Sequence, residues 1–155
     1  MTENSVIHST FVLERVYDAS PERVFAAWGD QKSKNRWFAN VENGNASTME
    51  VDFRIGGTER NTFVNHAGGP TFTYEAVFRD IVPNRRIVLT NHMHRDEDRI
   101  SVNVVSIEFE PEGDGTRVVL ADHGVYLDGL DRADWREEGT AKELDRLTDE
   151  LKRNP

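Results

Sequence analysis

Residues 19–28 read ASPERVFAAW, and the aromatic pair Trp37-Phe38 follows a few positions later. The pattern predicts a capped amphipathic helix over residues 21–28. The Ser20 hydroxyl can accept a hydrogen bond from a backbone N–H of the first turn, and Pro21 at the first helical position loses only an N–H that has no partner there. One face of the predicted helix carries its apolar residues, Val24, Phe25 and Trp28.

The composition limits the class of protein. The chain has 155 residues and is 37% hydrophobic, which fits one domain over residues 1–155 with its core at about 10–152. Its net charge of -9 disfavours binding to nucleic acid and to anionic membranes. It has no cysteine, so disulfides and thiolate chemistry are excluded. The first residues lack the order of a secretion signal, and we expect a cytoplasmic protein.

Alternating apolar and polar residues predict seven strands, one before the helix and six after it. Asp30 can cap a second short helix that leads into Trp37-Phe38. The predicted strands cover residues 10–17, 49–53, 58–64, 71–81, 86–94, 100–110 and 116–125.

A long helix is predicted at the C-terminus, from about Asp131, which can cap it, to Lys152. Its apolar stripe consists of Ala141, Leu144, Leu147 and Leu151. Its outer face is expected to be charged, and carries Lys142, Glu143, Asp145 and Arg146. The stripe must be buried, and a curved antiparallel sheet is the available partner. The predicted fold is therefore α+β, and a gap between the sheet and this helix would form a cavity.

Four segments carry a resemblance to a known family. They are residues 19–25 with Trp37-Phe38, residues 52–57, residues 80–87, and residues 105–111 with 113–116. Their order and spacing resemble the START-like (SRPBCC, helix-grip) superfamily, and within it the bacterial homologues of the activator of heat shock protein 90 ATPase, often labelled polyketide-cyclase-like. The resemblance implies a helix-grip fold, in which about seven antiparallel strands curve around the C-terminal helix and two short helices follow the first strand.

Two positions depart from the family pattern. Many relatives carry Gly-Trp where this chain has Gly139-Thr140, and Trp135 lies one turn earlier. Many relatives also carry an aromatic residue at the position of Asn91. Both departures predict a cavity that is more open or more polar.

The ligand-binding residues that we predict are aromatic residues near the cavity and polar residues on apolar strand faces. They are Trp37, Phe38, Phe53, Tyr74, Asn91, Asn103 and Trp135. Tyr74 is the one aromatic residue on the core face of its strand with a proton to donate, and Glu75 is expected to face outward. Neighbouring strands can bring Asn91 and Asn103 together. These amides either orient a ligand or form a structural network, because an unpaired buried amide costs about 1–3 kcal/mol.

His92 and His94 share one face of a strand, and Asp96 could add a third ligand for zinc or iron. A solvent-facing pair near a strand end also explains them, so we predict neither a metal site nor a cofactor. The chain has no Ser-Xaa-Xaa-Lys or Gly-Xaa-Ser-Xaa-Gly motif, and no catalytic residue is assigned. An enzyme would need an acid–base group in the cavity, for which Tyr74, Glu75 and His66 are the candidates.

We therefore expect the protein to bind a small hydrophobic, aromatic or polyketide-like ligand without catalysis. The alternative is a cyclase- or hydrolase-like enzyme that acts on such a ligand. A chaperone-associated partner binder is implied by the resemblance alone, and we do not expect a chaperone partner. Nucleic acid and membranes are not expected as partners either, and a homodimer is left open.

Overall fold

The computed structural model describes residues 4–39, 48–64 and 67–153. These residues form three helices and seven strands. In chain order they are β1 (Val6–Tyr17), α1 (Pro21–Gly29), α2 (Gln31–Trp37), β2 (Thr48–Val51), β3 (Thr58–Val64), β4 (Thr71–Val82), β5 (Arg86–Arg95), β6 (Asp98–Glu112), β7 (Gly115–Leu127) and α3 (Ala133–Arg153).

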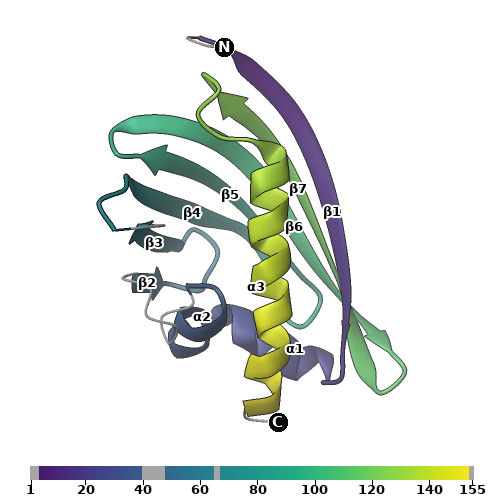
Figure 1. Cartoon of the computed structure of the whole chain (residues 1–155). Helices are drawn as coiled ribbons and strands as arrows, with labels where there is room; N and C mark the ends of the chain where they lie inside the picture. The colour runs from purple at the N-terminus through teal and green to yellow at the C-terminus, as the bar shows by residue number, and fades with distance from the viewer. Residues whose placement is uncertain (1–3, 40–47, 65–66, 154–155) are drawn as a thin grey trace.

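The seven strands form one antiparallel sheet in the order β1-β7-β6-β5-β4-β3-β2. The sheet curves around α3, which crosses its concave side, and α1 and α2 lie beside the C-terminal part of α3 (Figure 1). The predicted α+β helix-grip fold is confirmed. β1 begins at Val6 rather than at residue 10, because its pairing with β7 continues to Leu127. The strand predicted over residues 49–53 ends at Val51 in the structure, so Phe53 is not part of β2.

Both predicted caps of the short helices are present. The Ser20 hydroxyl accepts a hydrogen bond from the Arg23 N–H at 3.2 Å, and Asp30 Oδ2 accepts one from the Ser33 N–H at 3.0 Å. The apolar face of α1 is buried. Its aromatic rings pack edge-on against Phe109 of β6, which fixes the two helices against one end of the sheet.

α3 packs against the rest of the molecule mainly through its C-terminal half. Its buried residues are Leu144, Leu147, Glu150 and Leu151. The Tyr17 hydroxyl donates to the Leu144 carbonyl at 2.8 Å. The Glu150 carboxylate accepts from Ser33 Oγ at 2.9 Å and from Arg36 at 2.6 and 2.7 Å. The half of α3 before Leu144 has no residue in this buried set.

The start of α3 differs from the prediction. The helix begins at Ala133, two residues after Asp131. The Asp131 carboxylate instead accepts from the Arg132 N–H at 2.8 Å and from Arg136 at 3.2 Å. In the part of the chain that the structure describes, no helix combines the length and the apolar character needed to cross a membrane.

Candidate functional site

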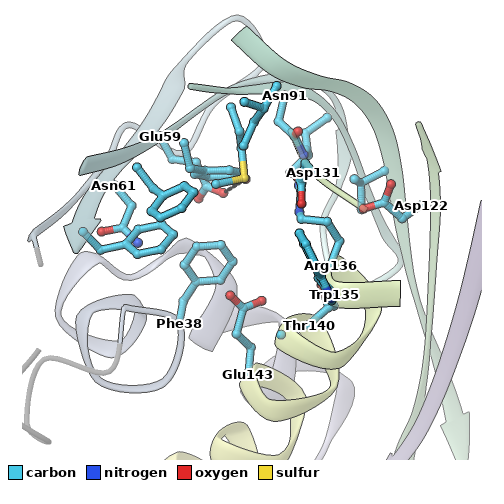
Figure 2. A pocket seen from close by; sticks show the side chains of 18 of the residues that line it. Phe38, Glu59, Asn61, Asn91, Asp122, Asp131, Trp135, Arg136, Thr140 and Glu143 are labelled. Carbon is cyan, nitrogen blue, oxygen red and sulfur yellow. Dashed lines mark hydrogen bonds and ion pairs between the residues drawn. The ribbon is translucent and has the colours of Figure 1, made fainter. Parts of the chain in front are cut away.

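A cavity of about 610 Å³ lies between the concave side of the sheet and the N-terminal half of α3. Alternation along β5 and β6 points one set of side chains into it. Figure 2 shows the open centre, with Glu59 and Asn61 on one side and Asp131 and Arg136 on the other. The apolar walls include Leu89, Met93, Ile100, Val105, Ile107 and Leu120.

Asn91 faces this cavity from β5. Its side chain is 5% exposed, and no described protein group donates a hydrogen bond to its carbonyl oxygen, Oδ1. Asn91 lies on the same face as Leu89 and Met93, as predicted, and is paired in register with Asn103 on β6. The Asn91 side chain is therefore a buried polar group that presents an unsatisfied acceptor to the cavity.

Asn103 belongs instead to a structural network. Its amide nitrogen donates to Asp122 Oδ1 and, at 3.2 Å, to the Tyr126 hydroxyl, both on β7. The neighbouring Gly124 leaves room for this amide, because a Cβ atom at that position would collide with the Asn103 side chain. Asp122 lines the cavity, and burial raises its pKa while Arg136 and Asn103 act to lower it.

The opposite wall holds a buried ion pair between α2 and β3. Lys34 Nζ lies 3.0 and 3.3 Å from the two carboxylate oxygens of Glu59, and each residue is 1% exposed. The Tyr74 hydroxyl donates to Glu59 Oε2 at 2.7 Å. Burial and the Glu59 charge raise the pKa of Tyr74 well above its usual value. Tyr74 therefore keeps its proton, which is already donated to Glu59.

This ion pair also touches the aromatic wall of the cavity. Lys34 Nζ lies 4.4 Å from the centroid of the Phe38 ring, and Phe38 packs at 5.4 Å against the Tyr74 ring. A desolvated ammonium over an aromatic face is stabilised by the ring quadrupole. The buried charge therefore fixes the position of Phe38, one of the rings that a ligand would meet.

Glu143 reaches into the cavity from α3 (Figure 2). The prediction that it lies on the outer, charged face of the helix is wrong. Glu143 lies four residues before Leu147, so its side chain leaves α3 on the same side as that buried residue and lines the cavity. Burial raises its pKa from 4.5 to about 7, although the positive charges of Arg146, Lys34 and Arg136 act in the opposite direction.

A second cluster of polar residues lies at the end of the cavity near the start of α3. Arg136 donates to Ser101 Oγ at 2.7 Å and to Asp131 Oδ2 at 3.2 Å. Burial raises the pKa of Asp131, and Arg136 limits the rise. Trp135 lies beside them and is 54% exposed, with the Arg132 guanidinium 4.9 Å from its ring. Trp135 therefore forms an exposed edge of the cavity.

The structure brings together four of the seven residues predicted to bind ligand, because Phe38, Tyr74, Asn91 and Trp135 all line the cavity. Asn103 is outside the lining, as described above. Trp37 is also outside it: its indole N–H donates to the Ala27 carbonyl at 2.9 Å, and its ring packs against Trp28.

Phe53, the remaining predicted residue, packs against Phe25 and Phe78 rather than toward the cavity. Of the candidates for an acid–base group, Glu75 is on the outer side of the sheet, 3.7 Å from His92. His66 lies outside the described residues.

The sequence analysis missed the charged residues of the lining, which are Lys34, Glu59, Arg95, Asp122, Asp131, Arg136 and Glu143. Two of them carried a usable signal. The spacing of Glu143 from Leu147 is one, and the alternation along β3 is the other, because it places Glu59 on the same face as Phe63. For Lys34 the local sequence offers no apolar pattern.

Residues 18–153 match the family described as activator of Hsp90 ATPase homolog 1-like protein. A solved structure from Rhizobium loti is 42% identical, with a TM-score of 0.86 over 94% of this chain and 99% of that chain. One from Rhizobium leguminosarum is 40% identical, with a TM-score of 0.92 over 99% and 100%.

A protein from Chromobacterium violaceum, 23% identical with a TM-score of 0.76 over 92% of this chain and 96% of that chain, shares the fold. No functionally curated protein matches the chain. The match over residues 18–153 and the two rhizobial structures agree with the helix-grip architecture, and the chain belongs to the activator of Hsp90 ATPase homolog 1-like family of the START-like superfamily.

Proposed function

We propose that the protein binds a small, largely apolar molecule that carries a hydrogen-bond donor, in the cavity between the sheet and α3. The observation that carries the proposal is the buried Asn91 carbonyl oxygen, which faces this cavity and has no donor among the described residues. Members of the START-like family commonly bind ligands, which supports the same function.

The dimensions of the cavity suit a small molecule. Ligand pockets usually measure about 300–1,000 Å³ and combine apolar walls with a few convergent polar groups, and this one measures about 610 Å³. The aromatic ring of Phe38 and the side chains of Leu89 and Met93 supply apolar surface. A flat apolar body would gain about 25 cal/mol for each Å² that it buries there.

The polar groups select the polar end of the ligand. An unsatisfied buried acceptor costs about 1–3 kcal/mol, so a ligand N–H or O–H that reaches Asn91 Oδ1 gains from the pairing. Glu143, with its pKa near 7, can donate a hydrogen bond when protonated and accept one when ionised. We infer that the preferred ligands carry an amine, amide or hydroxyl group on an apolar skeleton.

The test uses N-phenyl-1-naphthylamine, a neutral fluorescent probe with two aromatic systems and one N–H donor. Gly139 lines the cavity, and a Cβ atom there would have no neighbour within 4 Å. Gly139→Trp should therefore place an indole in the cavity, whereas Gly139→Ala should leave the cavity open. Saturable fluorescence enhancement is expected for the natural chain and for Gly139→Ala.

Gly139→Trp should weaken the binding of the probe by about tenfold or more, which corresponds to about 1.4 kcal/mol. Circular dichroism verifies that both variants are folded. The proposal fails if the natural chain shows no saturable enhancement, or if a folded Gly139→Trp variant binds the probe as tightly as Gly139→Ala does.

A second candidate function, an enzyme of the hydrolase or cyclase kind, is favoured by one observation. General acid–base catalysis is most efficient when the pKa lies near the working pH, and the Glu143 carboxyl meets that requirement inside the cavity. We would measure hydrolysis of 4-nitrophenyl esters by the natural chain and by Glu143→Gln. The enzyme is supported if the natural chain turns over the ester and Glu143→Gln abolishes the turnover while still binding the probe. The hydrolase form is refuted if the natural chain gives no turnover above buffer, or if the two proteins give equal turnover.

A further inference from the structure

Three metal-ligating side chains meet on the outer side of the sheet, away from the cavity. The ligand atoms of Glu75 on β4 and of His92 and His94 on β5 all lie within 4.8 Å of one another. All three side chains are half-buried. From this cluster we propose a binding site for a divalent transition ion such as Zn²⁺.

Strand geometry builds this cluster. His92 and His94 are two residues apart, so both side chains leave β5 on the same face. Glu75 is directly opposite His92 in the antiparallel register of β4 and β5, and directly opposite residues are close neighbours. The pairing of β5 with β6 also shifts register between Met93 and His94, an irregularity of the kind that changes the direction of a side chain.

The distances are close to those of a metal site. With metal–nitrogen and metal–oxygen bonds of about 2.0–2.2 Å, two ligands of a tetrahedral ion lie about 3.3–3.6 Å apart. His92 Nε2 and Glu75 Oε1 are 3.7 Å apart, and the two histidine ring centroids are 5.3 Å apart. Small side-chain rotations would thus bring three ligand atoms around one ion.

Asp96, the third ligand considered from the sequence, has another role. Its Oδ1 accepts a hydrogen bond from the Thr71 N–H at 3.0 Å, and its own N–H donates to the Thr71 carbonyl. Asp96 therefore links the turn between β5 and β6 to the start of β4 through two hydrogen bonds. The carboxylate nearest to the histidines belongs to Glu75.

The donor set determines the class of ion. Two imidazoles and one carboxylate suit zinc and related transition ions, whereas Mg²⁺ prefers oxygen ligands and octahedral geometry. Three protein ligands leave a coordination position open to solvent. Two arginines are paired with members of the cluster: Arg60 lies opposite Glu75, and Arg99 lies opposite His94. Their positive charges oppose the binding of a cation, so the negative charge of Glu75 is needed to attract the ion.

Calorimetric titration of the tag-free chain with Zn²⁺ at neutral pH tests the site. We expect saturation at one ion per chain, with no comparable heat from Mg²⁺. His92→Ala, His94→Ala and Glu75→Gln should each weaken Zn²⁺ binding about tenfold or more. His123→Ala is the matched control, because His123 is an exposed histidine on β7 of the same sheet.

Nuclear magnetic resonance of the histidine rings gives an independent readout. Zn²⁺ should shift the ring nitrogen signals of His92 and His94 and leave those of His123 unchanged. The proposal is overturned if Zn²⁺ does not saturate the chain, if binding survives the three ligand substitutions, or if His123→Ala weakens it equally. The three ligand side chains are half-buried on the outer face, so these variants should remain folded, which circular dichroism checks.

Discussion

Asn91 and Asn103 are paired across β5 and β6, but only the Asn103 amide nitrogen reaches other side chains. The same residue type therefore has two different roles on adjacent strands. The Oδ1 atoms of both residues lack a donor among the described residues. Asn103 nevertheless joins β6 to β7 through Asp122 and Tyr126, whereas Asn91 lines the cavity and presents its oxygen there. Substitutions at these two positions therefore distinguish an effect on ligand binding from an effect on the stability of the fold.

Asn91→Leu should raise the free energy of unfolding by about 1 kcal/mol, because it replaces an unsatisfied buried amide with an apolar group of similar shape. The same substitution should weaken the binding of N-phenyl-1-naphthylamine, since the N–H of the probe loses its acceptor. Urea denaturation measures the first effect and fluorescence titration the second.

Asn103→Leu is the matched control. It should lower the free energy of unfolding by about 1–3 kcal/mol, because Asp122 loses a buried hydrogen-bond donor. If both leucine variants lose stability by the same amount, the distinction between a site residue and a network residue is incorrect.

Removing Lys34 alone should be strongly destabilising. Lys34→Met leaves the Glu59 carboxylate buried without its cation, and breaking such a pair typically costs about 3–5 kcal/mol. The loss should appear as a lower denaturation midpoint in urea with an unchanged slope.

The double variant Lys34→Met with Glu59→Leu distinguishes the loss of a favourable pair from the exposure of an unpaired charge. It should recover much of the stability lost in Lys34→Met, because no buried charge remains. Tyr74 then loses its acceptor, so recovery should be incomplete. A double variant less stable than Lys34→Met would contradict this account.

Glu143 should make the stability of the protein depend on pH. Its pKa is raised from 4.5 to about 7 in the folded state, so the folded protein holds this proton more tightly than the unfolded chain does. The stabilisation is complete below pH 4.5 and is lost as the pH rises to about 7. Urea denaturation across this window measures it.

Glu143→Gln should lack this part of the pH dependence. The groups that face Glu143 are Arg146, Lys34, Arg136 and Glu59, and they remain in the variant, so their own effects cancel in the comparison. Between pH 4.5 and about 7 the variant should gain stability relative to the natural chain. Parallel stability curves for the two proteins would show that the Glu143 pKa is not raised.

Gly139→Ala should raise the free energy of unfolding by about 0.5–1 kcal/mol, because glycine inside a helix is less favourable than alanine by about that amount. Its added methyl group meets no atom within 4 Å, so no packing penalty opposes the gain. Thermal and urea denaturation measure the change, and a loss of stability would mean that this part of α3 is not helical in solution.

Much of the fold could be predicted from local signals. Ser20 and Asp30 cap their helices as expected, and the core residues of β4 and β5 alternate as expected. These features depend on neighbouring residues, so periodicity and capping chemistry are enough to find them. The buried residues of α3, Leu144 among them, follow the helical period for the same reason.

Most of the polar half of the cavity could not be predicted in this way. A charged side chain is normally taken as solvent-facing, yet Lys34 and Glu59 are buried together because each neutralises the other across two distant elements. Trp37 shows the opposite error, because it is predicted to bind ligand but is a structural residue. Its indole N–H donates a hydrogen bond to α1. Both outcomes depend on contacts that only the folded chain creates.

The division of α3 at Leu144 has a consequence for how ligand preference can be changed. The residues that secure the helix follow that point, while those that meet the cavity, such as Trp135, Arg136 and Thr140, precede it. Substitutions at Trp135 and Thr140 can therefore alter ligand preference with little penalty to folding, whereas Arg136 also links α3 to Ser101 and Asp131. Exchanging a few side chains on one half of a single helix would thus change what the cavity recognises, while the other half keeps the helix in place.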